Sequence, residues 1–102
     1  MKYSLEITDS AALDLVGISE YIAKESVSKA YAYHDDVMAK LKNLENEPFI
    51  GRPHTVKKFL KAGYRELIIL SHIAHYKVNE AKKQVSIIRV LHQSMNQAKH
   101  LK

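Results

Sequence analysis

The chain of 102 residues contains no cysteine. This absence excludes both a disulfide framework and a thiolate metal site, and it suits a reducing compartment such as the cytoplasm. No apolar run approaches the length that a membrane-spanning helix needs, and residues 1–13 lack the apolar stretch of a signal peptide. We therefore expect a cytoplasmic protein that makes no use of a membrane.

The sequence also lacks the common catalytic signatures. It has no glycine-rich phosphate loop, no His-Glu-x-x-His motif and no nucleophile elbow. Among six histidines, His72 and His75 have odd spacing on an expected strand and so point to opposite faces. His34 falls on the apolar stripe of an expected helix, which indicates a hydrogen-bonded boundary residue, while His54 and His100 fall in a loop and a tail. We expect no metal site and no cofactor.

What the chain does have is an excess of basic residues. Sixteen Lys and Arg stand against eleven Asp and Glu, which gives a net charge of +5. A basic surface attracts nucleic acid or an acidic protein partner. The alternative is a solvated face that only keeps the protein soluble, and charge alone does not separate the two readings.

Hydrophobic periodicity predicts one strand, two helices and three further strands. The expected elements are a strand over residues 3–7, a helix capped within 8–10 and ending near 24–25, a helix capped by Ser26 or Ser28 and stopped by Pro48, and strands over 64–71, 73–78 and 84–91. Residues 48–63, which contain both prolines and two of the three glycines, form a connection.

This order of elements predicts an α+β fold, β-α-α-β-β-β, as a single domain over residues 1–102. Two helices joined by a short break form an antiparallel hairpin, which we expect to cover one face of an antiparallel sheet. The last strand would place Val85, Ile87, Arg89 and Leu91 on one side, with apolar residues on the other side as well. We therefore expect the second sheet face to expose apolar residues that a partner or a second copy covers.

Two arginines and a histidine form the candidate site. Arg65 and Arg89 each lie in a strand otherwise made of apolar residues, where a guanidinium is costly unless it is paired or faces solvent. One reading is cross-strand pairing with Glu66 or Glu6, and the other is a basic patch that meets phosphate or carboxylate. His92 at the strand end has the chemistry for proton transfer.

Three motifs carry a resemblance to a known family. The stretches Gly63-Tyr64-Arg65-Glu66-Leu67, Tyr76-Lys77-Val78 and Arg89-Val90-Leu91-His92 resemble the RelE/ParE superfamily of small bacterial toxins from type II toxin–antitoxin modules, often called plasmid stabilization proteins. The resemblance covers nearly the whole chain and implies the same β-α-α-β-β-β order. It also implies a cognate antitoxin, which the net positive charge predicts to be acidic, and a homodimer or a toxin–antitoxin hetero-oligomer.

The resemblance implies two alternative activities. RelE-like members cut messenger RNA on the ribosome, whereas ParE-like members poison DNA gyrase. At strand positions where the RNase type places basic side chains, this chain has Leu67 and Ile73, and Gln93 follows His92 in place of an arginine. Metal-independent RNA cleavage needs a base, an acid and cationic stabilisation of the phosphorane, so we expect a ParE-like gyrase inhibitor. The end of the last strand also resembles the ParE type, although Asn96 stands where an acidic residue is usual.

These comparisons define the expected site residues. The target-binding candidates are Arg65, Arg89, His92, Gln93 and Lys99. We expect the two arginines to share one surface, and we expect the tail from Gln93 to Lys102 to be exposed. In an mRNA endoribonuclease, the alternative, Arg65, Arg89 and His92 would hold phosphate and supply a general acid. We expect His34, His54 and His100 to lie apart from this surface. A third reading, a non-enzymatic nucleic-acid-binding module, rests on net charge alone.

Overall fold

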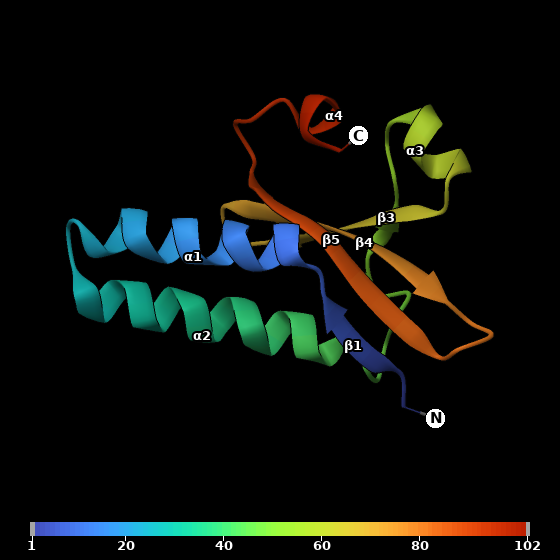
Figure 1. The fold of residues 1–102 in the computed structure, drawn as a ribbon, viewed down its shortest axis with the longest axis horizontal. Helices are drawn as coiled ribbons and strands as arrows, with labels where there is room; N and C mark the ends of the chain where they lie inside the picture. The colour runs from blue at the N-terminus through green and yellow to red at the C-terminus, as the bar shows by residue number, and fades with distance from the viewer. Residues whose placement is uncertain (1, 102) are drawn as a thin grey trace.

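The computed structural model describes residues 2–101, which form a five-stranded sheet with helices on both faces (Figure 1). The elements, in chain order, are β1 (Ser4–Ile7), α1 (Asp9–Ala23), α2 (Val27–Asn43), β2 (Arg52–Pro53), α3 (Lys57–Lys61), β3 (Tyr64–Ile69), β4 (His72–Asn79), β5 (Gln84–His92) and α4 (Gln97–His100). The predicted α+β fold and its β-α-α-β-β-β order are confirmed. The periodicity did not predict β2, α3 and α4.

The strands lie in the order β1-β5-β4-β3-β2. Neighbouring strands run antiparallel from β5 to β2, but β1 pairs parallel with β5, where Ser4 faces Gln84 and Ile7 faces Ile87. The prediction of a wholly antiparallel sheet is therefore wrong at this edge. A parallel pair requires a long crossover connection, and here both long helices and the β2–β4 segment supply it.

Hydroxyl caps start the two long helices, and one of them also joins α1 to the sheet. The Thr8 side chain accepts a hydrogen bond from the Ala11 amide at 3.3 Å and donates to the Ile87 carbonyl at 2.8 Å. Ser26 caps α2, as one of the two predicted caps. This helix ends at Asn43, five residues before Pro48, so a turn rather than the proline stops it. Thr8 thus fixes the start of α1 against the strand that leads into the candidate site.

The principal core lies between the helix hairpin and the sheet. Its fully buried members come from both layers: Ala11, Leu15, Val37, Leu41 and Leu44 from the helices or the turn after α2, and Ile69, Ala74, Tyr76, Val85, Ile87 and Val90 from the strands. Each large apolar side chain buried in this way contributes about 1.5–3 kcal/mol. The described helices include none that is long and apolar enough to cross a membrane.

A β-bulge changes the alternation of the last strand. Ile87 faces Tyr76 and Arg89 faces His75, so Ile88 is an extra residue on β5. Val90 therefore lies in the principal core, while Arg89 lies on the opposite face of the sheet. The prediction that Ile87 and Arg89 share one side is wrong, because hydrophobic alternation cannot reveal a single inserted residue.

The second face of the sheet carries its own covering layer. Figure 1 shows α3 and α4 on the side of the sheet away from the hairpin. Phe59 of α3 and Leu101 after α4 are buried, as are Ile73 and Leu91 of the strands. The expectation of a bare apolar face is therefore wrong, because the connection and the tail form short helices that cover it.

Candidate functional site

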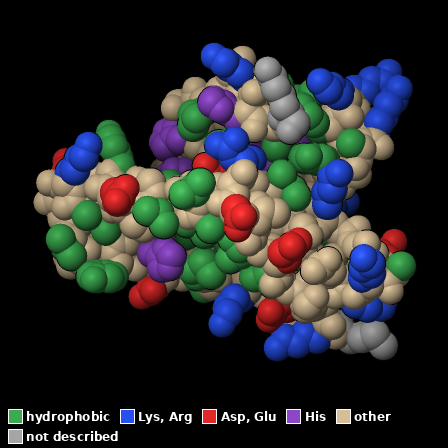
Figure 2. All heavy atoms as spheres, viewed as in Figure 1, with side chains coloured by type: hydrophobic (Ala, Val, Ile, Leu, Met, Phe, Trp, Pro, Cys, Tyr) green, Lys and Arg blue, Asp and Glu red, His purple; other side chains and the backbone are tan. Residues whose placement is uncertain are grey.

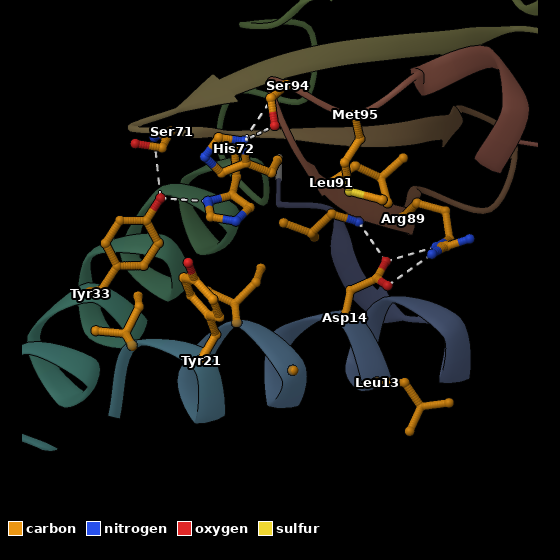
Figure 3. Close-up of a pocket in the computed structure, with 15 residues that line it drawn as sticks. Leu13, Asp14, Tyr21, Tyr33, Ser71, His72, Arg89, Leu91, Ser94 and Met95 are labelled. Carbon is orange, nitrogen blue, oxygen red and sulfur yellow. Dashed lines mark hydrogen bonds and ion pairs between the residues drawn. The ribbon is translucent and has the colours of Figure 1, made fainter. Parts of the chain in front are cut away.

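A groove of about 600 Å³ lies between α1 and the C-terminal end of β5 (Figure 3). Its walls include Leu13, Gly17 and Tyr21 of α1, and Met95 closes it from the C-terminal side. Polar groups enter from the strand ends, where His72 begins β4 and His92 ends β5. The groove therefore brings a predicted site residue, His92, next to a largely apolar surface.

His92 is an exposed polar residue of this groove. Its Nδ1 accepts a hydrogen bond from the Ser94 amide at 3.1 Å and lies 2.8 Å from the Ser94 hydroxyl. In the neutral ring the proton is therefore on Nε2. His92 can offer this N–H to a partner without breaking a bond within the protein.

His72 lies beside His92 but is held by the helix hairpin. The two rings meet edge to face with centroids 5.1 Å apart. The Ser71 amide donates to the Tyr33 hydroxyl at 3.2 Å, and this hydroxyl lies 2.6 Å from His72 Nδ1, to which it donates when the neutral ring carries its proton on Nε2. Burial lowers the pKa of His72 below its ordinary value of 6.5, and a charge on the adjacent His92 lowers it further. His72 is therefore a neutral part of the groove wall.

Arg89 is paired with two other parts of the chain. Its Nε and Nη2 donate to the two carboxylate oxygens of Asp14 at 2.7 and 2.9 Å, and its Nη1 donates to the His100 carbonyl at 3.0 Å. The Asp14 hydrogen bonds raise the pKa of Arg89. Pairing was one of the two predicted readings, but the expected partners Glu66 and Glu6 are wrong, since the acid comes from α1.

Arg65 lies on the other face of the sheet. Arg65 of β3 pairs with Tyr76 on the neighbouring strand β4. The next residue, Glu66, pairs with His75, and His75 pairs with Arg89 on β5. Residues paired across strands share a face and successive residues alternate, so the expected common surface of the two arginines is wrong. The Arg65 guanidinium donates to the backbone carbonyls of Phe49 and Gly51, and its buried Nε has no partner among the described residues.

The remaining predicted residues lie on the C-terminal segment. Gln93 donates from its side chain to the Leu70 carbonyl at 2.8 Å, which ties the segment to the β3–β4 turn. Lys99 is exposed on α4, and its amide donates to the side chain of Asn96 at 3.3 Å. Asn96 thus caps α4, a role that an aspartate also fills. Lys102, the end of the predicted tail, lies outside the described residues.

A buried cluster that the sequence did not predict lies beneath this segment. His54, predicted to be a loop residue remote from the site, is only 2% exposed. Its Nε2 lies 3.2 Å from His75 Nδ1 and 3.6 Å from a carboxylate oxygen of Glu66. Only the register of the short strand β2 on β3 brings His54 to His75, and a two-residue strand leaves no periodicity to find.

These three buried residues have spacings compatible with a metal site, since their ligand atoms lie within 4.8 Å of one another. The hydrogen bonds oppose that reading. The Val56 amide donates to His54 Nδ1 at 3.0 Å, whereas a metal-bound imidazole normally donates from its second nitrogen. Glu66 already accepts from Arg52 at 3.2 Å and from a backbone amide. The donors therefore fit a hydrogen-bond network rather than a metal site.

Burial is the main influence on the protonation of His75. It lowers the pKa of His75 below 6.5, and His54 and Arg89 act in the same direction. A hydrogen bond to Gln97 and the charge of Glu66 oppose the effect. The His75 ring is therefore neutral at physiological pH.

The fold is one already known among bacterial toxins. The toxin–antitoxin complex RelBE2 from Mycobacterium tuberculosis contains a chain that matches 91% of this one with a TM-score of 0.61 at 23% identity, which shows a shared fold. A structure described as the chromosomal ParDE TA system from P. aeruginosa matches 89% of this chain and 96% of its own, with a TM-score of 0.72 at 27% identity. These matches confirm the RelE/ParE-like architecture.

Sequence comparison narrows the class. Residues 5–97 match the profile of a family described as the ParE toxin of the type II toxin–antitoxin system, parDE. Toxin ParE1 of Caulobacter vibrioides is 37% identical over 92 residues, which cover 89% of this chain and 90% of that protein. The chain belongs to the ParE toxin family, and it is thus the toxin of a pair whose other member is an antitoxin.

Proposed function

We propose that this toxin acts in the cytoplasm by inhibiting DNA gyrase, and that it does not cut RNA. The observation that carries the proposal is the state of the two strand arginines. Arg89 is paired with both carboxylate oxygens of Asp14 and with a carbonyl, whereas Arg65 lies at the far end of β3 from His72 and donates to the carbonyls of Phe49 and Gly51. Neither guanidinium is available to stabilise a phosphorane in the groove.

The alternative, a ribosome-dependent mRNA endoribonuclease, needs an acid, a base and cationic stabilisation in one place. The groove supplies two histidines, but His72 Nδ1 is occupied by the Tyr33 hydroxyl. With Arg89 neutralised by Asp14, the groove residues supply no unpaired guanidinium to a phosphate. Blocking a large enzyme requires only a complementary surface, which this arrangement fits better.

The proposed target-binding surface is the C-terminal strip, defined as residues 92–99. It contains three of the five predicted target-binding residues, His92, Gln93 and Lys99, and it is exposed along most of its length. Gln93 and Asn96 hold its backbone in place through their side chains. The net charge of +5 attracts an acidic surface or DNA held by the target over long range.

We propose that the antitoxin covers the helix hairpin and the adjoining groove. Large apolar side chains are exposed there, with Leu13 72% and Tyr21 73% accessible on α1 and Tyr31 70% accessible on α2. Figure 2 shows hydrophobic side chains gathered over the hairpin. A contiguous apolar surface of this kind marks a protein interface. An acidic segment that folds on binding satisfies both this surface and the toxin's charge.

The same apolar surface also fits a second copy of the toxin. Light scattering of the isolated toxin and of the toxin with the product of the neighbouring reading frame separates a homodimer from a hetero-oligomer. We expect the added protein to take over the hairpin surface and raise the melting temperature. No change in assembly or stability on its addition would contradict the proposed interface.

Gyrase inhibition is tested with purified gyrase and supercoiled plasmid, beside a ribosome assay on translated messenger RNA. We expect trapped, cleaved DNA in the first assay and intact message in the second. Codon-specific cuts with gyrase unaffected would favour the endoribonuclease instead.

Charge reversal tests the strip directly. Lys99→Glu should weaken gyrase inhibition several-fold, since a rim charge mainly steers association. Lys42→Glu, at an exposed position of α2, is the matched control and should leave inhibition unchanged. Equal effects of the two variants would assign the role to net charge and not to the strip.

A further inference from the structure

A line of hydrogen bonds crosses the second face of the sheet and ends at the C-terminal strip. It starts at the Val56 amide, which donates to His54 Nδ1 at 3.0 Å. It continues from His54 Nε2 to His75 Nδ1 at 3.2 Å, and from His75 Nε2 to the Gln97 side-chain oxygen at 2.7 Å. Three separate parts of the chain, the loop after β2, the strand β4 and the strip, are thus joined end to end.

The far end of this line shapes the strip itself. The side-chain nitrogen of Gln97 donates to the carbonyls of His92 and Met95, each at 2.8 Å. Gln97 therefore closes the turn that presents His92 to the groove. Without the hydrogen bond from His75, the Gln97 side chain that holds this turn would no longer be fixed to the sheet.

The partners decide where every proton lies. Gln97 uses its nitrogen on two carbonyls, so its oxygen must accept, and His75 must carry its proton on Nε2. His75 Nδ1 is then an acceptor, which His54 fills with its own Nε2 proton. His54 Nδ1 accepts from a backbone amide that cannot reverse its direction. Both rings are neutral in the same tautomer.

We propose that His54, His75 and Gln97 form a hydrogen-bonded latch that positions the C-terminal strip, and that protonation of His75 breaks this latch at its joint with His54. The three are positioning residues for the strip. Their relevance to target binding rests on the proposed function, whereas the latch itself is a property of the fold.

Protonation opens the latch because each bond in it has one direction. A second proton on His75 would sit on Nδ1 and meet the Nε2 proton of His54 across 3.2 Å. A second proton on His54 would sit on Nδ1 and meet the Val56 amide proton across 3.0 Å. In both cases a buried hydrogen bond becomes a contact between two donors, and a buried donor without an acceptor is destabilising.

The charges around the two rings favour the neutral state only in part. Glu66 of β3 attracts a proton, but Arg52 of β2 pairs with it. Arg89 of β5 repels a proton, and its own charge is balanced by Asp14. The phenol of Tyr64 on β3 meets His54 edge to face, and α3 presents Phe59, over which Lys58 lies. The α4 side contributes the neutral amide of Gln97.

Nitrogen-detected NMR of the wild-type protein tests the latch without any substitution. At pH 7.5 we expect both rings in the Nε2–H tautomer, and on acidification we expect His75 to titrate with a pKa lowered from its ordinary value and the Val56 amide signal to change with it. A charged His75 ring at neutral pH, or a Val56 amide signal that does not respond to the titration of His75, would overturn the proposal.

Substitutions at Gln97 provide the second test, because this side chain is only half-buried. Gln97→Glu keeps an acceptor for His75 but removes the donors to the strip and adds a negative charge, so the apparent pKa of His75 should rise. Hydrogen exchange of strip amides should become about tenfold faster, since hydrogen bonds that hold the turn are lost. Gln84→Glu at the start of β5 is the matched control and should do neither. An unchanged His75 titration in Gln97→Glu would contradict the latch.

Gyrase assays separate failure of the latch from failure of the proposed function. If wild-type toxin inhibits gyrase, Gln97→Glu should weaken gyrase inhibition by about the same factor by which it speeds hydrogen exchange of the strip amides. Unchanged inhibition with a deprotected strip would refute the positioning role. If wild-type toxin leaves gyrase untouched, the proposed function fails, while the NMR titration still decides whether the latch exists.

Discussion

Two pairs of histidines meet on opposite faces of strand β4, one around His72 and one around His75, and their environments differ. The inner pair, His54 and His75, is buried and every ring nitrogen has a partner. The groove pair, His72 and His92, meets at the edge of an open groove, and His92 is exposed. The inner histidines thus stabilise the fold, whereas His92 of the groove pair is open to a binding partner. The inner pair differs in that both rings are buried and each ring nitrogen has a hydrogen-bond partner.

The largest expected effect breaks the inner pair. His75→Leu fills the space but leaves the His54 Nε2 donor and the Gln97 oxygen without their partner. We expect a loss of about 3 kcal/mol in the free energy of unfolding, the cost of orphaned buried polar groups. Urea titration measures it, and His34→Ala on α2 is the control, expected to cost less than about 1 kcal/mol. Similar losses in both variants would remove the distinction between inner and other histidines.

Acid should weaken the fold through the buried His72 and His75, one histidine of each pair. Burial lowers the pKa of His75 and of His72 below 6.5, so the native state binds fewer protons than the unfolded chain. The stabilisation is complete above pH 6.5 and declines as the pH falls below that value. We expect a loss on the order of 1 kcal/mol between pH 7.5 and pH 5.5, measured by urea titration. A smaller pH dependence is expected in His75→Leu, and an identical one would exclude the inner pair as its source.

A smaller effect sharpens the contrast within the groove pair. Tyr33→Phe removes the hydroxyl that donates to His72 and accepts from the Ser71 amide. We expect a loss of about 1 kcal/mol and a rise in the pKa of His72, since its neutral form loses a donor. Tyr31→Phe, on the exposed side of α2, is the control. A His72 titration unchanged by Tyr33→Phe would show that burial alone sets its protonation.

The smallest effect on stability should accompany the largest effect on activity. His92→Ala removes an exposed ring whose hydrogen bonds are local, so unfolding should change by less than about 0.5 kcal/mol. Gyrase inhibition should fall strongly, because His92 is the polar donor that the groove leaves unused. Full inhibition by His92→Ala would place the target contact elsewhere on the strip.

Periodicity predicted the parts of the fold with repeating burial. The helix hairpin and the three long strands each show several turns or alternations, and all were found close to their expected bounds. The strand β2 has two residues and includes Pro53, so it leaves no such pattern. The bulge at Ile88 also leaves no sequence pattern, because one extra residue changes which face the following side chains point to without changing the composition of the strand.

The candidate site was less predictable than the fold for a related reason. Its exposed members, His92 and Lys99, follow from their places at the end of the last strand and in the tail beyond it. The partners of Arg89 and His75 do not, since Asp14 lies 75 residues and His54 lies 21 residues away in the chain. Such contacts depend on which strands become neighbours and in what register, which a single sequence leaves open.

The parallel pairing of β1 with β5 has a consequence for how the toxin is made. The first strand to leave the ribosome has its partner 80 positions later, where Ser4 faces Gln84. Pairing over such a separation is slow, because the chain must first close a long loop. A chain that stops anywhere before β5 cannot complete this edge or place His92 beside α1. The groove and the strip can thus form only after almost the whole chain has been made.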